Sequence, residues 1–384
     1  MVGGPYCLHC GALTTRSDDR RRRSFAVQSG EGVFQLAVVT TVMPHANGRT
    51  ANRYRWALGL GALVVVVTTL AGLLPAAVFS GALVVPVTYA LYLYDHGIGG
   101  EAPGSAWVAV LLTAALSVLV SLVFFRWVFD DQFTRLVGSP RRAGLGTLPV
   151  GPFLVFVLLL PLVAQIAMNA GAAWLVTRPR LDDMLDGLAF GVMAGTVYAG
   201  GESIVAYWSV FTAAQLRTTQ GLGTWLPVIL GVMVVKAFVY GLATGLTVAA
   251  FSGRNEGWQG FGRRHGLAFA TALGALVAYW AGIRLLSYVD NGAWLGLLWG
   301  VVVLVALTAY ARATLHAALL ETALEEVAAH RTSSAAVTGV GTCPECSMAL
   351  PDGALFCVAC GQSVRATSAR ARRDLRTAAA GDIA

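Results

Sequence analysis

Long apolar stretches recur along most of the chain, and short polar segments separate them. Each stretch holds roughly 18 residues or more, enough for an α-helix to cross about 30 Å of hydrocarbon. The pattern predicts an all-α polytopic membrane protein with about eight transmembrane helices, at residues 56–73, 76–94, 105–129, 151–177, 185–211, 224–251, 266–289 and 292–312. The first two are joined by a short turn around Leu74 and Pro75.

The segments on either side of this 56–312 transmembrane domain predict four further parts. Residues 1–55 form a cytoplasmic, arginine-rich tail, whose apolar stretch at 33–43 is too short to span. Residues 313–341 are expected to form a stalk helix and a small-residue linker, because leucines recur there at helical spacing. A cysteine module at 342–363 and a basic, disordered tail at 364–384 follow.

The composition favours a bilayer as the solvent. Hydrophobic residues make up 56% of the 384 positions, charged residues make up 12%, and the mean hydropathy is +0.66. A soluble domain carries roughly twice that share of charge, so a membrane protein is the first interpretation. The net charge of +7 is carried by arginine, since Lys236 is the single lysine of the chain.

The arginines in the tail and the short loops predict the orientation of the spans. With the N-terminus inside, the outer side holds four arginines, at positions 135, 141, 142 and 217. The cytoplasmic side then holds Arg16, Arg20, Arg21, Arg22, Arg23, Arg49, Arg53, Arg55, Arg178, Arg180, Arg254, Arg263 and Arg264. Both termini are therefore expected in the cytoplasm, where the six cysteines stay reduced. The first 55 residues show no secretory signal.

The C-terminal cysteines have the spacing of a zinc site. Two Cys-x-x-Cys turns supply the four ligands, which are Cys343, Cys346, Cys357 and Cys360. Four thiolates close the tetrahedral shell of zinc, so the site is structural, and the metal supplies the folding free energy of so short a segment. The stretch resembles the short zinc-ribbon family at the ends of many bacterial membrane proteins, with Ser347 in place of the usual glycine. The resemblance implies a bacterial cytoplasmic (inner) membrane.

A further Cys-x-x-Cys turn stands alone near the N-terminus. Cys7 and Cys10 form half a zinc knuckle. They could recruit a further ligand such as His45, pair with another subunit, or be the remains of a second ribbon. This possible second metal site stays open.

The stretch from Asp186 to Ser203 combines regularly spaced glycines with a carboxylate. Gly187, Gly191 and Gly195 recur every four residues, so a helix presents them on one face and lets a neighbouring helix approach closely. Close packing does not explain Glu202, because a charge within a span is costly and is usually functional.

This stretch resembles the PrsW family of intramembrane metalloproteases, relatives of the CAAX-processing protease clan. The family has Asp-Gly-Leu, spaced glycines and Phe-Ala-x-x-Glu-Asn on one helix. Here the spacing is the same, with Tyr198 for the phenylalanine and Ser203 for the asparagine. A loosened form of the family's Tyr-x-x-Asp…Glu-Pro loop follows Tyr94, with Asp95, Glu101 and Pro103. The resemblance covers roughly residues 75–290.

The catalytic positions of the family are not matched. Its paired glutamates correspond to Ala164 and Gln165, its lysine to Met168, and its histidine to Lys236. An amide cannot act as a general base, and an ammonium has no lone pair for a metal. The span over 266–289 supplies no replacement histidine in its candidate stretch, 278–282.

Other acids and histidines offer weaker alternatives. Glu325, Glu326 and His330 superficially resemble the acid pair of the wider clan, but they lie on the stalk, where such residues are normally solvated. His265 and His316 lie at span ends and are expected to be interfacial. An active protease with rearranged catalytic residues remains the alternative.

The membrane site is instead expected to hold an ion pair. At about 1.5 Å per residue, Glu202 lies roughly 14 Å, and Lys236 roughly 18 Å, inside the outer end of its span. The two residues share one membrane layer on consecutive antiparallel helices, so the ammonium is predicted to neutralise the carboxylate, leaving Glu202, Lys236 and Asp186 as a remnant site. In the alternative, Lys236 snorkels and Glu202 is protonated.

These expectations together predict a proteolytically inactive, PrsW-like binding or regulatory scaffold with structural zinc. The expected partners are membrane lipids, with anionic headgroups at the basic tails, and a transmembrane protein. Nucleic acid is not the expected partner, because the tails lie beside the membrane. A transporter is disfavoured because no inverted repeat is visible in the sequence.

Overall fold

The computed structural model describes residues 41–43, 53–95, 103–128, 150–176, 184–208, 222–251, 262–332, 340–342, 349–351, 354 and 357. Contacts divide the chain into two units. The larger, which we call the helical unit, comprises Arg53–Leu91 and Gly104–Leu307. The second unit contains the remaining described residues, including the end of the last helix and a β-hairpin.

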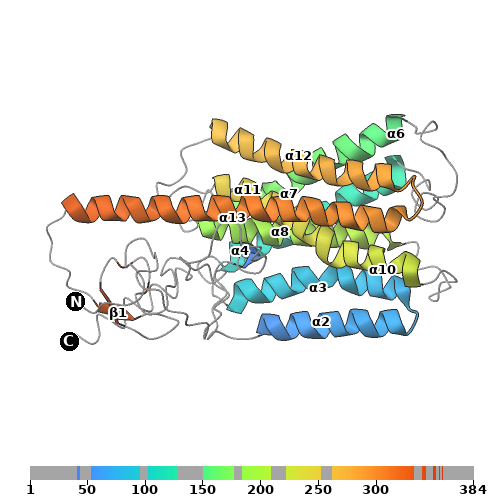
Figure 1. Cartoon of the computed structure of the whole chain (residues 1–384), viewed down its shortest axis with the longest axis horizontal. Helices are drawn as coiled ribbons and strands as arrows, with labels where there is room; N and C mark the ends of the chain where they lie inside the picture. The colour runs from blue at the N-terminus through green and yellow to red at the C-terminus, as the bar shows by residue number, and fades with distance from the viewer. Residues whose placement is uncertain are drawn as a thin grey trace. The chain divides into compact units, whose positions relative to one another are not determined.

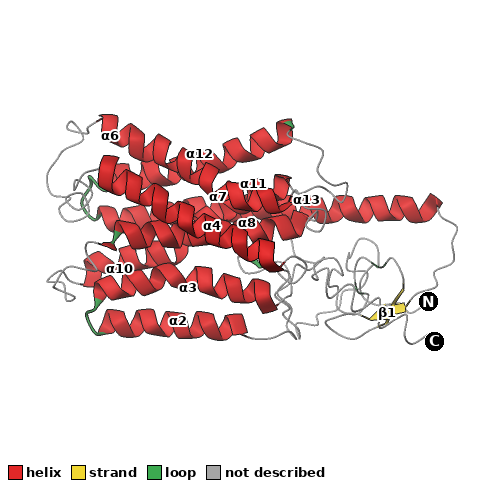
Figure 2. Ribbon diagram, turned by 180° about the vertical axis from the view of Figure 1, so that it is seen from behind, coloured by secondary structure: helices red, strands yellow, loops and turns green. Residues whose placement is uncertain are grey.

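The described residues form the following elements (Figures 1 and 2). The first half of the chain contains α2 (Arg53–Leu70), α3 (Leu74–Asp95), α4 (Pro103–Leu122) with the π-helical η2 (Val123–Val128), and α6 (Val150–Leu154), η4 (Val155–Leu159) and α7 (Leu160–Val176) in succession. The second half contains α8 (Met184–Ala206), then α10 (Leu222–Leu230), the π-helical η5 (Gly231–Lys236) and α11 (Ala237–Phe251) in succession, then α12 (Arg263–Leu286) and α13 (Gly292–Thr332).

Eight helical segments within the described residues are long and apolar enough to cross a membrane. They are Arg53–Leu70, Leu74–Asp95, Trp107–Phe125, Val155–Trp174, Gly187–Ala206, Trp225–Phe251, Arg263–Leu286 and Gly292–Leu315. Each overlaps one of the stretches expected from the sequence, which confirms the helical architecture and the eight candidate membrane spans.

The turn between α2 and α3 lies earlier than the sequence suggested. Gly72 has φ +73°, a left-handed conformation that glycine adopts without steric cost. Its N–H donates to the carbonyl of Thr69 at 3.1 Å, and the N–H of Leu73 donates to that of Thr68 at 2.9 Å. This pair of bonds is a Schellman motif, so α2 ends at Leu70, and Leu74 begins α3 instead of lying in the turn.

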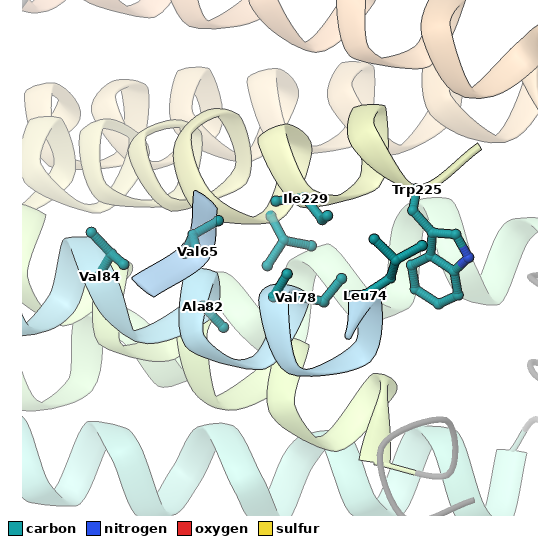
Figure 3. Close-up of a cluster of buried hydrophobic side chains, with 9 residues drawn as sticks. Val65, Leu74, Val78, Ala82, Val84, Trp225 and Ile229 are labelled. Atoms are coloured by element: carbon teal, nitrogen blue, oxygen red, sulfur yellow. The ribbon is translucent and has the colours of Figure 1, made fainter. Parts of the chain in front are cut away.

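A hydrophobic cluster packs α2 and α3 against α10 and η5 (Figure 3). Val65 of α2 and Leu74 of α3 belong to it, as do Trp225 and Ile229 of α10 and Val232 of η5. The indole of Trp225 lies over the beginning of α3 (Figure 3). The N-terminal part of the Trp225–Phe251 segment is thereby packed against α2 and α3.

Glycines allow α8 and α11 to pack almost backbone to backbone. A Cβ on Gly191 would lie 2.6 Å from the Cα of Gly245, and one on Gly195 would overlap the carbonyl oxygen of Tyr240. Gly241 and Gly245 on α11 mirror the spacing of Gly191 and Gly195 on α8. The predicted close approach is confirmed for Gly191 and Gly195, and it brings the side chains around Glu202 and Lys236 together.

In the second unit, the helix expected after the last span is confirmed, because α13 continues to Thr332. The strands β1 (Val340–Thr342) and β2 (Ala349–Pro351) pair antiparallel, with Thr342 opposite Ala349. Cys343 and Cys346 belong to the connection between these strands, which lies outside the described residues. Cys357 is described and is buried.

Candidate functional site

An ion pair lies inside the helical unit between α8 and η5. The Nζ of Lys236 is 3.0 Å from Oε1 of Glu202, and the side chains are only 7% and 1% exposed. The contact confirms the predicted pairing of these two residues. The alternative, in which the Lys236 side chain snorkels toward the interface, is wrong, because the ammonium lies against Glu202 of α8.

Both oxygens of Glu202 accept hydrogen bonds. The hydroxyl of Tyr240, one turn along α11 from Lys236, donates to Oε2 at 3.1 Å and lies 3.4 Å from Oε1. The same hydroxyl accepts the indole N–H of Trp280 from α12 at 2.8 Å. Tyr240 of α11 therefore orients the carboxylate of α8 directly, and Trp280 of α12 orients the hydroxyl of Tyr240. These hydrogen bonds offset part of the cost of burying the charge.

The ammonium of Lys236 has two further kinds of partner. It donates to Oγ of Ser203 at 2.9 Å, and this hydroxyl donates in turn to the carbonyl of Ala199 at 2.7 Å. Its Nζ also lies 5.6 Å from the ring centre of Tyr240 and 5.7 Å from that of Trp280, within cation–π range. Ser203 thus accepts a hydrogen bond from the same ammonium that pairs with Glu202.

The backbone around Lys236 departs from α-helical geometry. Lys236 is the last residue of the π-helical η5, and such turns are often found at functional sites. Upstream, Pro227 has no N–H to donate to the carbonyl of Gly223. The indole of Trp294 in α13 donates to that carbonyl at 3.1 Å instead. The span is thereby held by a neighbouring helix where its own hydrogen bonding is interrupted.

This arrangement does not fit a metal centre. The carboxylate of Glu202 is directed at an ammonium and a phenol, and the ammonium would repel a second cation. Among the residues that the structure describes, no three His, Cys, Asp or Glu side chains come together as metal ligands. The chemistry that the arrangement does support is neutralisation and positioning of charge within the membrane layer.

A second buried polar group lies between α7 and α11. Gln165 donates from Nε2 to Oγ1 of Thr247 at 3.1 Å. Asn169, one turn further, donates from Nδ2 to the backbone carbonyl of Gln165 at 2.7 Å. The hydroxyl of Thr244 lies 3.4 Å from the sulfur of Met168. These side chains thus form an uncharged layer between α7 and α11.

The other candidate residues lie apart from this site or outside the described part. Asp186 lies in the first turn of α8. His265 accepts the N–H of Gly262 at 2.7 Å and stacks on Phe251 at 5.3 Å, so it holds the start of α12, consistent with an interfacial role. The remaining candidates on α13 are His316, Glu325, Glu326 and His330. The cysteines at positions 7, 10, 343, 346 and 360, with His45 and Glu101, lie outside the described residues.

Sequence reasoning missed the aromatic part of the site. A signal for Tyr240 was present, since Lys236, Tyr240, Thr244 and Thr247 follow one another at helical spacing on one span. Trp280 lies in the 278–282 stretch, and no sequence pattern links it to Glu202. Its role depends on how α12 is rotated against α11.

Comparison with known proteins adds no identification: no family model, no curated protein and no solved structure matches this chain.

Proposed function

We propose that this chain is a PrsW-like membrane protein that has lost proteolytic activity and binds a transmembrane segment of another protein as a regulatory scaffold. The observation that supports the proposal best is the ion pair between Lys236 and Glu202. In the family that the sequence resembles, a histidine at the lysine position would serve a metal. A lysine there supplies positive charge without supplying Lewis-acid chemistry.

The surroundings of Glu202 favour this proposal over the rival, an active protease with rearranged catalytic residues. A general base needs a free lone pair directed at the water that it activates. Here Glu202 is buried, and its two oxygens are already engaged by the ammonium of Lys236 and the hydroxyl of Tyr240. Gln165 at the position of a catalytic acid is an amide and cannot take up the proton.

We further propose that the C-terminal segment is a zinc ribbon. Its ligands would be Cys343, Cys346, Cys357 and Cys360, and the zinc would be structural because four thiolates leave no open position. Two observations support the fit. The strands β1 and β2 flank the first Cys-x-x-Cys turn in sequence, and the Cys357 side chain is buried. Cys7 and Cys10 could supply a second metal site.

The proposed setting is the cytoplasmic membrane of a bacterium, with both termini in the cytoplasm. The arginine asymmetry of the loops supports this orientation. It places the basic tails beside a leaflet rich in anionic headgroups, which attract arginine. The ribbon then lies where its thiols stay reduced.

A reconstitution experiment tests the proposed function. The full chain in nanodiscs is mixed with zinc and a transmembrane peptide that carries a photoreactive side chain. We expect saturable cross-linking of the peptide to the chain and an unchanged peptide mass. A water-soluble peptide of equal length is the control for non-specific labelling.

Two results would contradict the proposal. Metal-dependent cleavage that disappears in Glu202→Gln would establish a protease. Cross-linking that an excess of unlabelled peptide does not reduce would mean that the chain has no site for a transmembrane segment.

A further inference from the structure

Arg284 carries a positive charge at the boundary of a candidate membrane span. It lies in the last turn of α12, two residues before that span ends at Leu286, which is about 3 Å of helical rise. Its side chain is partly exposed. At this depth the hydrocarbon of a bilayer gives way to the layer of lipid headgroups. The charge therefore lies close to the headgroups.

One side of the guanidinium is covered by an aromatic ring. Its central carbon, Cζ, lies 4.1 Å from the ring centre of Phe156, in the π-helical η4. Phe156 is buried and packs edge-on against Trp280, with the ring centres 5.0 Å apart. Trp280 is held in turn by its hydrogen bond to Tyr240. The cation–π contact thus fixes the guanidinium on a supported platform, but a ring cannot satisfy five N–H donors as an anion can.

The described part of the chain does not supply that anion. Among the residues that the structure describes, no carboxylate pairs with Arg284. The last carbonyls of α12 are engaged by other donors, since those of Ile283, Leu285 and Leu286 each accept a backbone N–H. The carbonyl of Arg284 itself accepts the hydroxyl of Ser287 at 2.7 Å. The guanidinium is therefore available to a group from outside the protein.

Apolar surface borders the arginine and its platform. Leu285 follows Arg284 in sequence, and Leu154 and Leu158 stand two residues before and after Phe156. All three leucines are exposed. Exposed leucines at the ends of membrane spans are in contact with acyl chains, because the bilayer surrounds the helices. A ligand that matches both surfaces combines an anionic group and hydrocarbon in one molecule.

We propose that Arg284 binds the phosphate group of a membrane lipid. Two phosphate oxygens match two N–H groups of a guanidinium, and such charge-assisted hydrogen bonds are stronger than those to a neutral acceptor. Phosphate is the anion that a bilayer presents at this depth, whereas water, which also reaches it, brings no charge. The site is independent of the proposed scaffold function, because it uses neither Lys236 nor Glu202.

Thermal unfolding of the purified full chain in a non-ionic detergent tests the site. One sample contains dioleoylphosphatidylglycerol, and a second contains dioleoylglycerol, which has the same acyl chains and no phosphate. A third contains inorganic phosphate without lipid. The phospholipid should raise the melting temperature by about 2 °C or more over both other samples, because it alone combines the anion with hydrocarbon.

Substitutions locate the effect. Arg284→Gln removes the charge and should abolish most of the difference between the samples. Arg263→Gln is the matched control, because Arg263 is an exposed arginine at the opposite end of the same helix, and this variant should retain the difference. If Arg284→Gln does not fold, Arg284→Lys takes its place. It keeps the charge but not the planar fork, so the difference should fall to about half or less.

Native mass spectrometry gives the direct result, in which the wild type retains more phospholipid than Arg284→Gln. Equal melting temperatures with the phospholipid and with dioleoylglycerol would overturn the proposal and leave water as the partner of Arg284. Equal stabilisation by inorganic phosphate alone would overturn the assignment to a lipid. Equal losses in Arg263→Gln and Arg284→Gln would overturn it too, by showing that the lipid responds to net charge and not to this site.

Discussion

At the scale of single residues, the Lys236–Glu202 contact is a pair of charges that depend on each other. Removing one member leaves the other buried in a medium that solvates it poorly, which is far more costly than the net gain from the intact pair. Removing both leaves no unpaired charge. The losses of stability in the two single variants and in the double variant can therefore be compared by experiment.

A double-mutant cycle tests the coupling. Glu202→Gln and Lys236→Met should each lower the free energy of unfolding by about 3 kcal/mol. The double variant should regain much of that loss, because the two residues are in contact and their effects are not additive. Thermal unfolding of the four proteins in detergent supplies the comparison. Losses that simply add in the double variant would show that the two side chains do not meet in the folded protein.

The pair was accessible to sequence reasoning because depth in a membrane can be counted. Glu202 and Lys236 lie at similar distances from the ends of consecutive spans, and their opposite charges leave few alternatives. Ser203, Tyr240 and Trp280 could not be found in this way. A hydroxyl or an aromatic ring within a span is compatible with lipid, with packing and with a polar site, and only the rotation of each helix decides among them.

At the scale of elements, α8 and α11 are held together by shape. Their glycines bring two backbones so close that a methyl group on either helix would meet main-chain atoms. Main-chain atoms cannot rotate away as a side chain can, so this contact has little tolerance. The glycine spacing on α8 predicted a close neighbour, but the spacing alone does not say which helix that neighbour is.

Two alanine substitutions separate this effect from general helix propensity. The Cβ of Gly195→Ala would overlap the carbonyl of Tyr240 and should lower the free energy of unfolding by about 2 kcal/mol. Gly274→Ala on α12 has no atom within 4 Å and should raise the free energy by up to about 1 kcal/mol, because alanine favours helix. Unfolding in a denaturing detergent measures both. Equal effects at the two positions would mean that α8 and α11 are not in contact through Gly195.

At the scale of the whole molecule, the eight spans were predicted because an apolar run of about 20 residues is rarely compatible with anything but a membrane helix. Their boundaries shifted by a few residues where local geometry intervened, as at Gly72 between α2 and α3. The orientation in the membrane and the metal content remain predictions.

Topology can be measured with reporter fusions. An enzyme active only in the cytoplasm should be active when fused after Asp95, Arg180 or Gly257, and at the C-terminus. An enzyme active only outside should report from Ser139 and Thr219. The arginine distribution is the physical reason for this expectation. An external C-terminus would require an odd number of crossings and would remove the chain's thiols from a reducing compartment.

Zinc content tests the C-terminal module separately. Purified chain should contain about one tightly held zinc, or up to two if Cys7 and Cys10 assemble a second site. Replacing Cys343 and Cys346 by serine should remove one equivalent and leave the melting of the helical unit unchanged, because the metal stabilises only its own short segment. Elemental analysis gives the stoichiometry. Full metal retention in the variant would refute the assignment of these ligands.

The π-helical turn η5 changes which neighbours a single stripe of residues can reach. In an unbroken α-helix, Trp225, Ile229 and Val232 would lie on nearly the same face as Lys236 and Tyr240. A π turn accommodates one extra residue and so offsets the helical phase by about 100°. The first three residues therefore pack on α2 and α3, while the last two meet α8 and α12. Deleting one residue within η5 would restore the phase and turn Trp225, Ile229 and Val232 toward the same neighbours as Lys236 and Tyr240.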